Sequence, residues 1–429
     1  MDQNTTPAPS TTPPLAPIPN TSDQGRLQIM VFSKDIAKPL EGANITITET
    51  GTDKTVDKLV TSNVGKTPDI NLATPPVEYS MEPYQPKPYG EYDLTIVAEG
   101  HQTAKINGVQ ILPGTLALQN IALTPFQELG QKTIIDIEQN TLYGIFPPKI
   151  PESPVKPLPP SKELVVLPQV VIPETIVVHG GVPNDKTAQN YYVPFKEYIK
   201  NVASCEIYSN WPYSTITANV LAILSFTLNR VYTEWYRGKG YNFTITNSTA
   251  FDHAFNYGRN IFSEISTVVD DIFTSYITKP DIRQPLLTQY CDGQRVSCPN
   301  WMTQWGSKYL GDQGYTAINI LKHFYGQEIY LMQAEKVQGI PSSYPGYDLQ
   351  MGSTGEAVRT IQTQLNAIAK NYPLIPKVKV DGVFGQDTLN AVKAFQNTFN
   401  LPATGIVDYP TWYKISDVFV AVQNLAELK

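Results

Sequence analysis

The spacing of apolar residues changes from one stretch of the chain to the next. Between residues 26 and 125 apolar and polar residues alternate, as in Leu27, Ile29 and Val31. Alternation with period two, interrupted by turn sequences such as Pro113-Gly114, is typical of strands with one buried face. We therefore predict a β-sandwich over residues 26–125.

Apolar residues follow a helical spacing between residues 174 and 340. They recur every three or four positions, which places them on one face of a helix. Three such faces are Phe195, Ile199 and Val202; Ile216, Val220, Ile223 and Val231; and Ile261, Ile265, Val268, Val269 and Ile272. The pattern predicts a central domain of mixed structure that is rich in helices.

A third pattern follows the break at Pro341-Ser-Ser-Tyr-Pro-Gly346. Residues 345–419 carry two more helical stripes, joined by the turn sequence Asp381-Gly382. The stripes are Val358, Ile361 and Leu365, and then Leu389, Val392 and Phe395. The fold class predicted for the whole chain is multidomain α+β, with a small helical domain at its C-terminal part.

Two stretches rich in proline stand apart from these domains. Residues 1–25 are a Pro/Thr-rich leader that we expect to be disordered. Residues 126–173 form a connector with nine prolines between Pro147 and Pro173, which favours an extended and exposed chain. Exposed segments of this kind are where proteases cut, so the connector is the expected processing site.

Composition and charge exclude several functions. The net charge is −7 and no basic stripe is present, which argues against nucleic acid as a partner. No apolar run is long enough to span a membrane, and the first 20 residues hold six prolines in place of the apolar core of a signal peptide. Three cysteines are too few for a disulfide framework to organise the fold.

The tail and the sandwich each resemble a known module. Asp381, Gly382, Phe384, Gly385, Gln396 and Trp412 match the motif of the common three-helix peptidoglycan-binding domain, although Pro373–Lys377 lengthens a loop. The resemblance implies that this domain binds the cell wall. Residues 26–125 resemble the carboxypeptidase regulatory-like sandwich, a module that implies no chemistry.

Two stretches of the central domain resemble the lytic transglycosylases of the sporulation stage II protein D family. The first contains Glu206 followed by Trp211-Pro212, and the second contains Gln304-Trp305-Gly306. Together with the other domains, the chain is similar to the spore cortex-lytic enzymes of clostridia. The resemblance implies that Glu206 is the catalytic acid and base, with its pKa raised by an apolar wall such as Ile207 and Trp211.

The second stretch also contains the residues expected to reach the glycan. They are Tyr290, Asp292, Gly293, Gln294 and Gln304, together with Trp211 from the first stretch. Trp305 is expected to be a packing residue, as are Cys205, His179 and His323. Cys291 and Cys298 could form a disulfide or half of a metal site, but no full set of ligands can be assembled, so neither a metal nor another cofactor is expected.

The resemblance implies a zymogen that degrades spore cortex peptidoglycan during germination. Its expected partners are that peptidoglycan and a subtilisin-like germination protease that cuts the connector. The expected location is the cortex and coat region of the spore, after deposition from the mother cell. Two alternatives remain open, a scaffold protein that binds cortex without cleaving it and a hydrolytic muramidase, while an amidase would need metal ligands that are not apparent.

Overall fold

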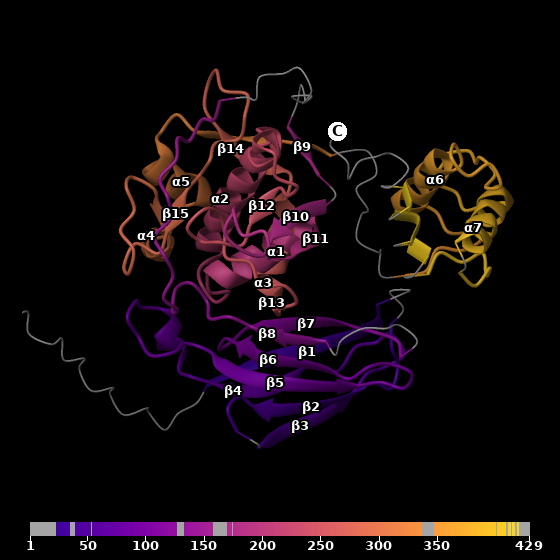
Figure 1. The fold of residues 1–429 in the computed structure, drawn as a ribbon, viewed down its shortest axis with the longest axis horizontal. Coiled ribbons are helices and arrows are strands. Elements are labelled where there is room, and N and C mark those ends of the chain that lie inside the picture. The colour runs from indigo at the N-terminus through magenta and orange to yellow at the C-terminus, as the bar shows by residue number, and fades with distance from the viewer. Residues whose placement is uncertain are drawn as a thin grey trace, which may run out of the picture.

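The computed structural model describes residues 23–34, 39–52, 54–126, 133–157, 170–173, 175–336, 347–399 and 401–408, and the short pieces 411–412, 414–416 and 418–419. The protein is mixed α+β, with a sheet-rich N-terminal region, a helix-rich central region and a helical tail (Figure 1). Within these ranges no helix combines the length and apolar character needed to cross a membrane. Most of the predicted leader lies outside them.

The N-terminal region consists of two sheets that pack on each other (Figure 1). One holds β1 (Asp23–Ser33), β4 (Ile70–Thr74) and β7 (Leu116–Leu123), and the other holds β2 (Asn44–Glu49), β3 (Thr55–Val60), β5 (Gly90–Val97) and β6 (Ala104–Ile111). The alternating residues Leu27, Ile29 and Val31 are buried between them, as predicted. Because β1 begins at Asp23, the sandwich starts three residues before the predicted boundary at 26.

Elements from later in the chain complete both sheets. Strand β8 (Ile134–Asp136) pairs with β6, and β13 (Ile261–Phe262) pairs with β7. Two buried hydrogen bonds cross the same junction. The Asn260 side-chain amide donates to the Gln110 carbonyl at 2.9 Å, and the Arg259 guanidinium donates to the Gln110 side-chain oxygen at 3.1 Å. The sandwich and the central region therefore share one continuous core, and the predicted division at residue 125 is wrong as a physical boundary.

The central region is built around α2 (Tyr213–Tyr232), which contacts the other helices. These are α1 (Phe195–Glu206), α3 (Ser263–Ile272), α4 (Gln304–Asp312) and α5 (Ala317–Tyr325). Short strands surround the helices. One sheet has three strands, β10 (Thr175–His179), β11 (Asn190–Pro194) and β12 (Ile245–Thr246). The other strands form two-stranded sheets: β14 (Ser275–Thr278) with β17 (Tyr330–Gln333), β15 (Tyr290–Cys291) with β16 (Met302–Thr303), and β9 (Val171–Ile172) with β18 (Glu335–Lys336). Two of the predicted apolar faces lie in α1 and α2, whereas the third begins in β13 before α3.

The predicted connector is extended but only partly exposed. Its described residues 133–157 contain no helix, and Ile145 is 97% exposed. Other parts are firmly attached to the central region: the Thr141 N–H donates to the Cys205 carbonyl at 2.9 Å, and Glu152 pairs with the buried Arg230. The expectation of an exposed connector is therefore met only in part of this stretch, because polar and charged groups anchor the rest, while residues 158–169 lie outside the described ranges.

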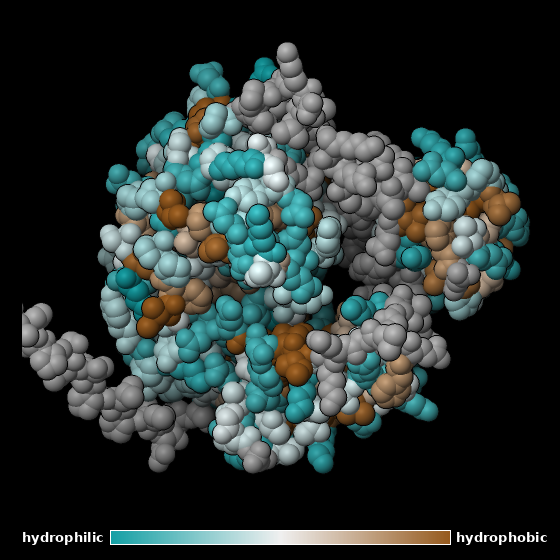
Figure 2. Space-filling view, viewed as in Figure 1, coloured by the Kyte–Doolittle hydropathy of each residue, from teal (hydrophilic) through white to brown (hydrophobic). Residues whose placement is uncertain are grey.

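The tail has a hydrophobic core of its own, separate from that of the other regions. Helices α6 (Glu356–Ile368) and α7 (Gln386–Thr398) are followed by residues 411–419, which are helical at every described position. Gly382 takes the left-handed conformation (φ 75°) that the predicted turn requires. The visible face of the protein is mostly hydrophilic, with apolar residues in small groups (Figure 2).

Candidate active site

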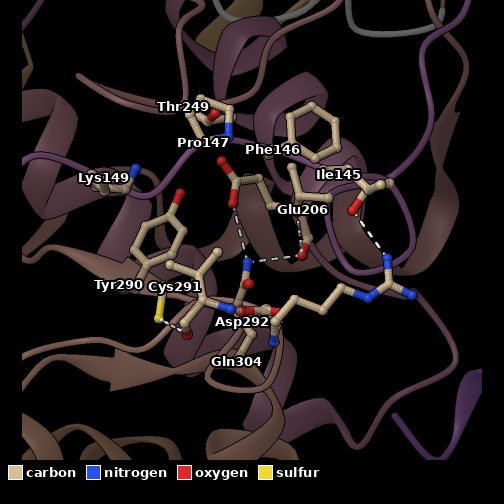
Figure 3. A pocket seen from close by; sticks show the side chains of 14 residues that line it. Ile145, Phe146, Pro147, Lys149, Glu206, Thr249, Tyr290, Cys291, Asp292 and Gln304 are labelled. Carbon is tan, nitrogen blue, oxygen red and sulfur yellow. Dashed lines mark hydrogen bonds between the residues drawn. The ribbon is translucent and has the colours of Figure 1, made fainter. Parts of the chain in front are cut away.

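Glu206 is the last residue of α1, and its side chain is buried, with 4% exposure. The helix ends there because Ile207 is extended (φ −136°, ψ 166°). One carboxylate oxygen accepts from the Ala254 N–H at 2.8 Å and the other from the Gln304 amide at 3.1 Å. The same amide donates to the Glu206 carbonyl at 2.8 Å, so Gln304 holds the end of the helix and its carboxyl group together (Figure 3).

Burial raises the pKa of the Glu206 carboxyl, because a charge in a medium of low polarity is costly. The positive charge of Lys149 opposes this effect, as do the hydrogen bonds from Ala254 and Gln304. The raised pKa agrees with the expectation from the sequence, and it keeps part of the population protonated at higher pH than an exposed glutamate would allow. A carboxyl group of this kind can act first as an acid and then as a base.

The carboxyl group of Glu206 lies in a cavity of about 140 Å³ (Figure 3). Four segments of the chain line it besides α1: the connector, the loop after β12 with Thr249, the strand and loop from Tyr290, and the start of α4. Its lining residues include Thr141, Ile145, Phe146, Pro147, Lys149, Tyr290, Asp292, Arg295 and Gln304. Ile207 and Trp211, which the sequence suggested as the apolar wall, are buried but are not among its lining residues.

Lys149 is a member of this site that the sequence did not reveal. Its ammonium group is buried, donates to the Asp252 carbonyl and lies 4.9 Å from the ring centre of Tyr290. In Figure 3 the Tyr290 hydroxyl lies between Lys149 and Glu206. Burial lowers the pKa of Lys149, and the charge of Glu206 opposes that shift. A lysine in a proline-rich stretch carries no pattern that could have identified it.

The Asp292 side chain organises the loop after β15 by accepting hydrogen bonds from the backbone of that loop. The Asp292 carboxylate accepts from the N–H groups of Arg295 and Val296, each at 2.8 Å, and from that of Gln294 at 3.3 Å. Gly293 is left-handed (φ 76°), and a Cβ there would lie 2.4 Å from Thr303. Cys291 and Cys298 are joined in a disulfide, which decides between the two possibilities left by the sequence.

Gln294 and Trp211, two of the predicted glycan-binding residues, contact the sandwich instead of an open groove. The Gln294 carbonyl accepts from the Tyr84 hydroxyl at 2.8 Å, and the Trp211 indole N–H donates to the Ser80 carbonyl at 2.8 Å. Trp305 is buried beside Trp211. Glycan contact by Tyr290, Asp292, Gly293, Gln294, Gln304 and Trp211 stays a prediction.

Cys205, His179 and His323, which the sequence predicted to be structural, each contact a neighbouring side chain. Cys205 is buried against Asn201, His179 stacks on Phe243, and His323 contacts Phe324. In the described part of the chain no three side chains of His, Cys, Asp or Glu are grouped so that they could hold a metal ion.

The motif residues of the tail build its bundle. Phe384 and Trp412 lie in the core, and the buried Gln396 amide donates to Ile406 at 2.9 Å and accepts from Gly405 at 2.8 Å. Gln362 makes the equivalent bonds to the turn at Asp381-Gly382, accepting from the Gly382 N–H at 2.8 Å. Two buried glutamines thus fix the two loops that follow the two helices.

Comparison with known proteins identifies the tail. Residues 354–415 match the family model of a peptidoglycan binding domain. Among solved structures the chain is similar to the SleB N-terminal domain, with 32% identity over 18% of this chain and 97% of that chain and a TM-score of 0.16. No match is found among curated proteins.

Two further solved structures are similar at low identity. One is the 5-hydroxyisourate hydrolase of Klebsiella pneumoniae, with 18% identity over 23% of this chain and 90% of that chain and a TM-score of 0.16. The other is GBS52, the minor pilin of Streptococcus agalactiae, with 16% identity over 26% of this chain and 49% of that chain and a TM-score of 0.18. The family match to the tail therefore carries the identification: this is a cell-wall-related protein with a helical peptidoglycan-binding domain in its C-terminal part.

Proposed function

We propose that this chain is a lytic transglycosylase that cleaves the glycan strands of spore cortex peptidoglycan. The observation that carries the proposal is the buried carboxyl group of Glu206, with a raised pKa, at the wall of a cavity in a protein that binds peptidoglycan. The resemblance to sporulation stage II protein D enzymes assigns the catalytic role to the same residue.

One carboxyl group is enough for this reaction. Protonated Glu206 donates its proton to the glycosidic oxygen while the bond from C1 of the muramic acid to that oxygen breaks. The resulting carboxylate then removes the proton from the C6 hydroxyl of the same sugar, and the C6 oxygen bonds to C1 to give a 1,6-anhydromuramic end. The nucleophile belongs to the substrate, so the attack is intramolecular and avoids the entropy cost of holding a water molecule in place.

A hydrolytic muramidase would need a second carboxylate beside the glycosidic bond. Asp292 lines the cavity, but its oxygens already accept the three backbone N–H groups of its own loop. This arrangement favours a structural role for Asp292 and hence the transglycosylase reaction over the hydrolase.

We also propose that the full chain is a zymogen of the spore cortex and coat region, deposited there from the mother cell and cut by a subtilisin-like germination protease between about residues 140 and 165. Two features of the connector support this. Ile145 is almost fully exposed, and its neighbours Phe146 and Pro147 line the cavity of Glu206, so a cut near them opens the site.

The test is digestion of purified cortex by the full chain and by the cut protein, followed by mass spectrometry of the products. Anhydromuramic ends released by the cut protein, and a loss of at least about a hundredfold in Glu206→Gln, are the expected results. Reducing ends would identify a hydrolase. Binding without turnover in the cut protein would identify a scaffold, and equal lysis by the uncut chain would refute the zymogen.

A further inference from the structure

Three large aromatic side chains lie together beside the candidate site. Tyr208, Trp211 and Trp305 have ring centres 5.0 to 6.2 Å apart. Tyr208 follows Glu206 by two residues, and Trp305 follows Gln304, whose amide holds the Glu206 carboxyl group. The aromatic group is therefore connected to the catalytic carboxyl group through two segments of the chain, the end of α1 and the start of α4.

A segment of the sandwich, residues 77–84, covers this aromatic group. Ser80 accepts twice, from the Trp211 indole N–H at its carbonyl (2.8 Å) and from the Asn210 amide at its hydroxyl (2.7 Å). A small cavity at the same junction is lined by Tyr79 and Tyr84 on one side and by Tyr208 and Trp305 on the other. The contact joins parts of the chain more than a hundred residues apart.

The connector extends this cover toward Glu206. Arg295, in the loop after β15, donates to the Gly144 carbonyl at 3.0 Å, and its guanidinium lies 5.7 Å from the ring centre of Tyr143. Residues 77–84 and 141–147 thus lie at two cavities that share Arg295 in their lining, one beside the aromatic group and the other at Glu206.

Residues 77–84 present hydroxyl groups and acceptor oxygens to the aromatic group, as a sugar would. Ser80 contributes a carbonyl and a hydroxyl oxygen, and Tyr84 contributes a hydroxyl that donates to the Gln294 carbonyl. Beneath them are aromatic faces and N–H donors, a combination that binds amphipathic ligands with apolar faces and polar edges. The side-chain amide oxygen Oδ1 of Asn210 is buried with no hydrogen-bond partner and is available to accept from a ligand hydroxyl.

We infer that Tyr208, Trp211 and Trp305 form an extended binding surface for the glycan strand, and that residues 77–84 of the sandwich occupy this surface until the chain is cut. The inference rests on the proposed function and deepens it. The sandwich then inhibits by competition for the surface that the substrate uses, and the cut acts by removing the covalent link that, together with the shared core, keeps that competitor in place.

The test uses the full, uncut chain and a variant that displaces the cover. Ser80 is fully buried, so the indole of Ser80→Trp must push residues 77–84 away from Trp211. Glu78→Trp places the same side chain on the exposed face of the same turn and is the matched control. Binding is measured with soluble glycan fragments of one and of three disaccharide repeats, and turnover as anhydromuramic ends.

Uncut Ser80→Trp should bind the longer fragment at least about tenfold more tightly than the uncut wild-type chain, while Glu78→Trp should match the wild type. In the cut protein, Trp211→Leu should raise KM for the longer fragment about tenfold and leave that for the shorter one within about twofold. If Ser80→Trp, with an unchanged circular dichroism spectrum, binds no better than wild type, or if Trp211→Leu affects both lengths equally, the inference is wrong. A cut wild-type protein that binds the longer fragment but yields no anhydromuramic ends would refute the proposed reaction alone.

Discussion

Replacing Gln304 by leucine tests how the structure controls the acidity of Glu206. The Gln304 amide donates to the ionised carboxylate at 3.1 Å and therefore stabilises the charged form. A hydrogen bond to a charged group contributes about 1.5 to 3 kcal/mol. At 3.1 Å the bond is longer than the strongest charge-assisted bonds, so we take the lower value, about 1.5 kcal/mol. Since about 1.4 kcal/mol corresponds to one pKa unit, Gln304→Leu should raise the pKa of Glu206 by about one unit.

The pH profile of glycan cleavage by the cut protein measures this shift. Glu206 must be protonated to act as the acid, so activity falls as the pH rises through its pKa, and that fall should move about one unit higher in Gln304→Leu. Gln289→Leu is the control, because Gln289 is a buried amide that binds Ile150 and Glu152 of the connector but has no bond to Glu206. An alkaline limb that stays in place in Gln304→Leu, or shifts equally in both variants, would refute the reasoning.

Three further predictions concern charge and domain function. The folded-state pKa of Glu206 is raised, so its contribution to stability is complete below the unfolded pKa of about 4.3 and is lost as the pH rises through the folded value; the melting temperature of Glu206→Gln relative to wild type should therefore increase between pH 5 and pH 8. Arg230→Met leaves Asp252 without its buried ion-pair partner and Glu152 with Lys156 alone, and should lower the free energy of unfolding by about 3 to 5 kcal/mol, measured with denaturant. Deletion of residues 345–429 should weaken sedimentation with insoluble peptidoglycan more than cleavage of short soluble fragments, because the tail raises the local substrate concentration; equal losses would mean that the tail supports folding instead.

The order of secondary structure could be read from the sequence because it depends on local periodicity. Alternation in Leu27, Ile29 and Val31 predicted a strand, and the spacing of Phe195, Ile199 and Val202 predicted α1, since each pattern reports which side of one element is buried. The two helices of the tail and its glycine turn at Gly382 were predicted in the same way, whereas its peptidoglycan-binding role came from a family resemblance. Domain boundaries were less accurate, because β8 and β13 cross them to complete the sheets of the sandwich.

The sequence by itself determined the main elements of this protein and, through a family resemblance, its peptidoglycan-binding tail. Only the tertiary structure placed Lys149, Tyr290 and Gln304 around that carboxyl group and residues 77–84 over Trp211. The physical reason is that periodicity records the burial of residues within one element, whereas a site is made by contacts between segments far apart in the chain. Such contacts depend on how the elements pack, and no local pattern around Lys149 or Ser80 encodes them.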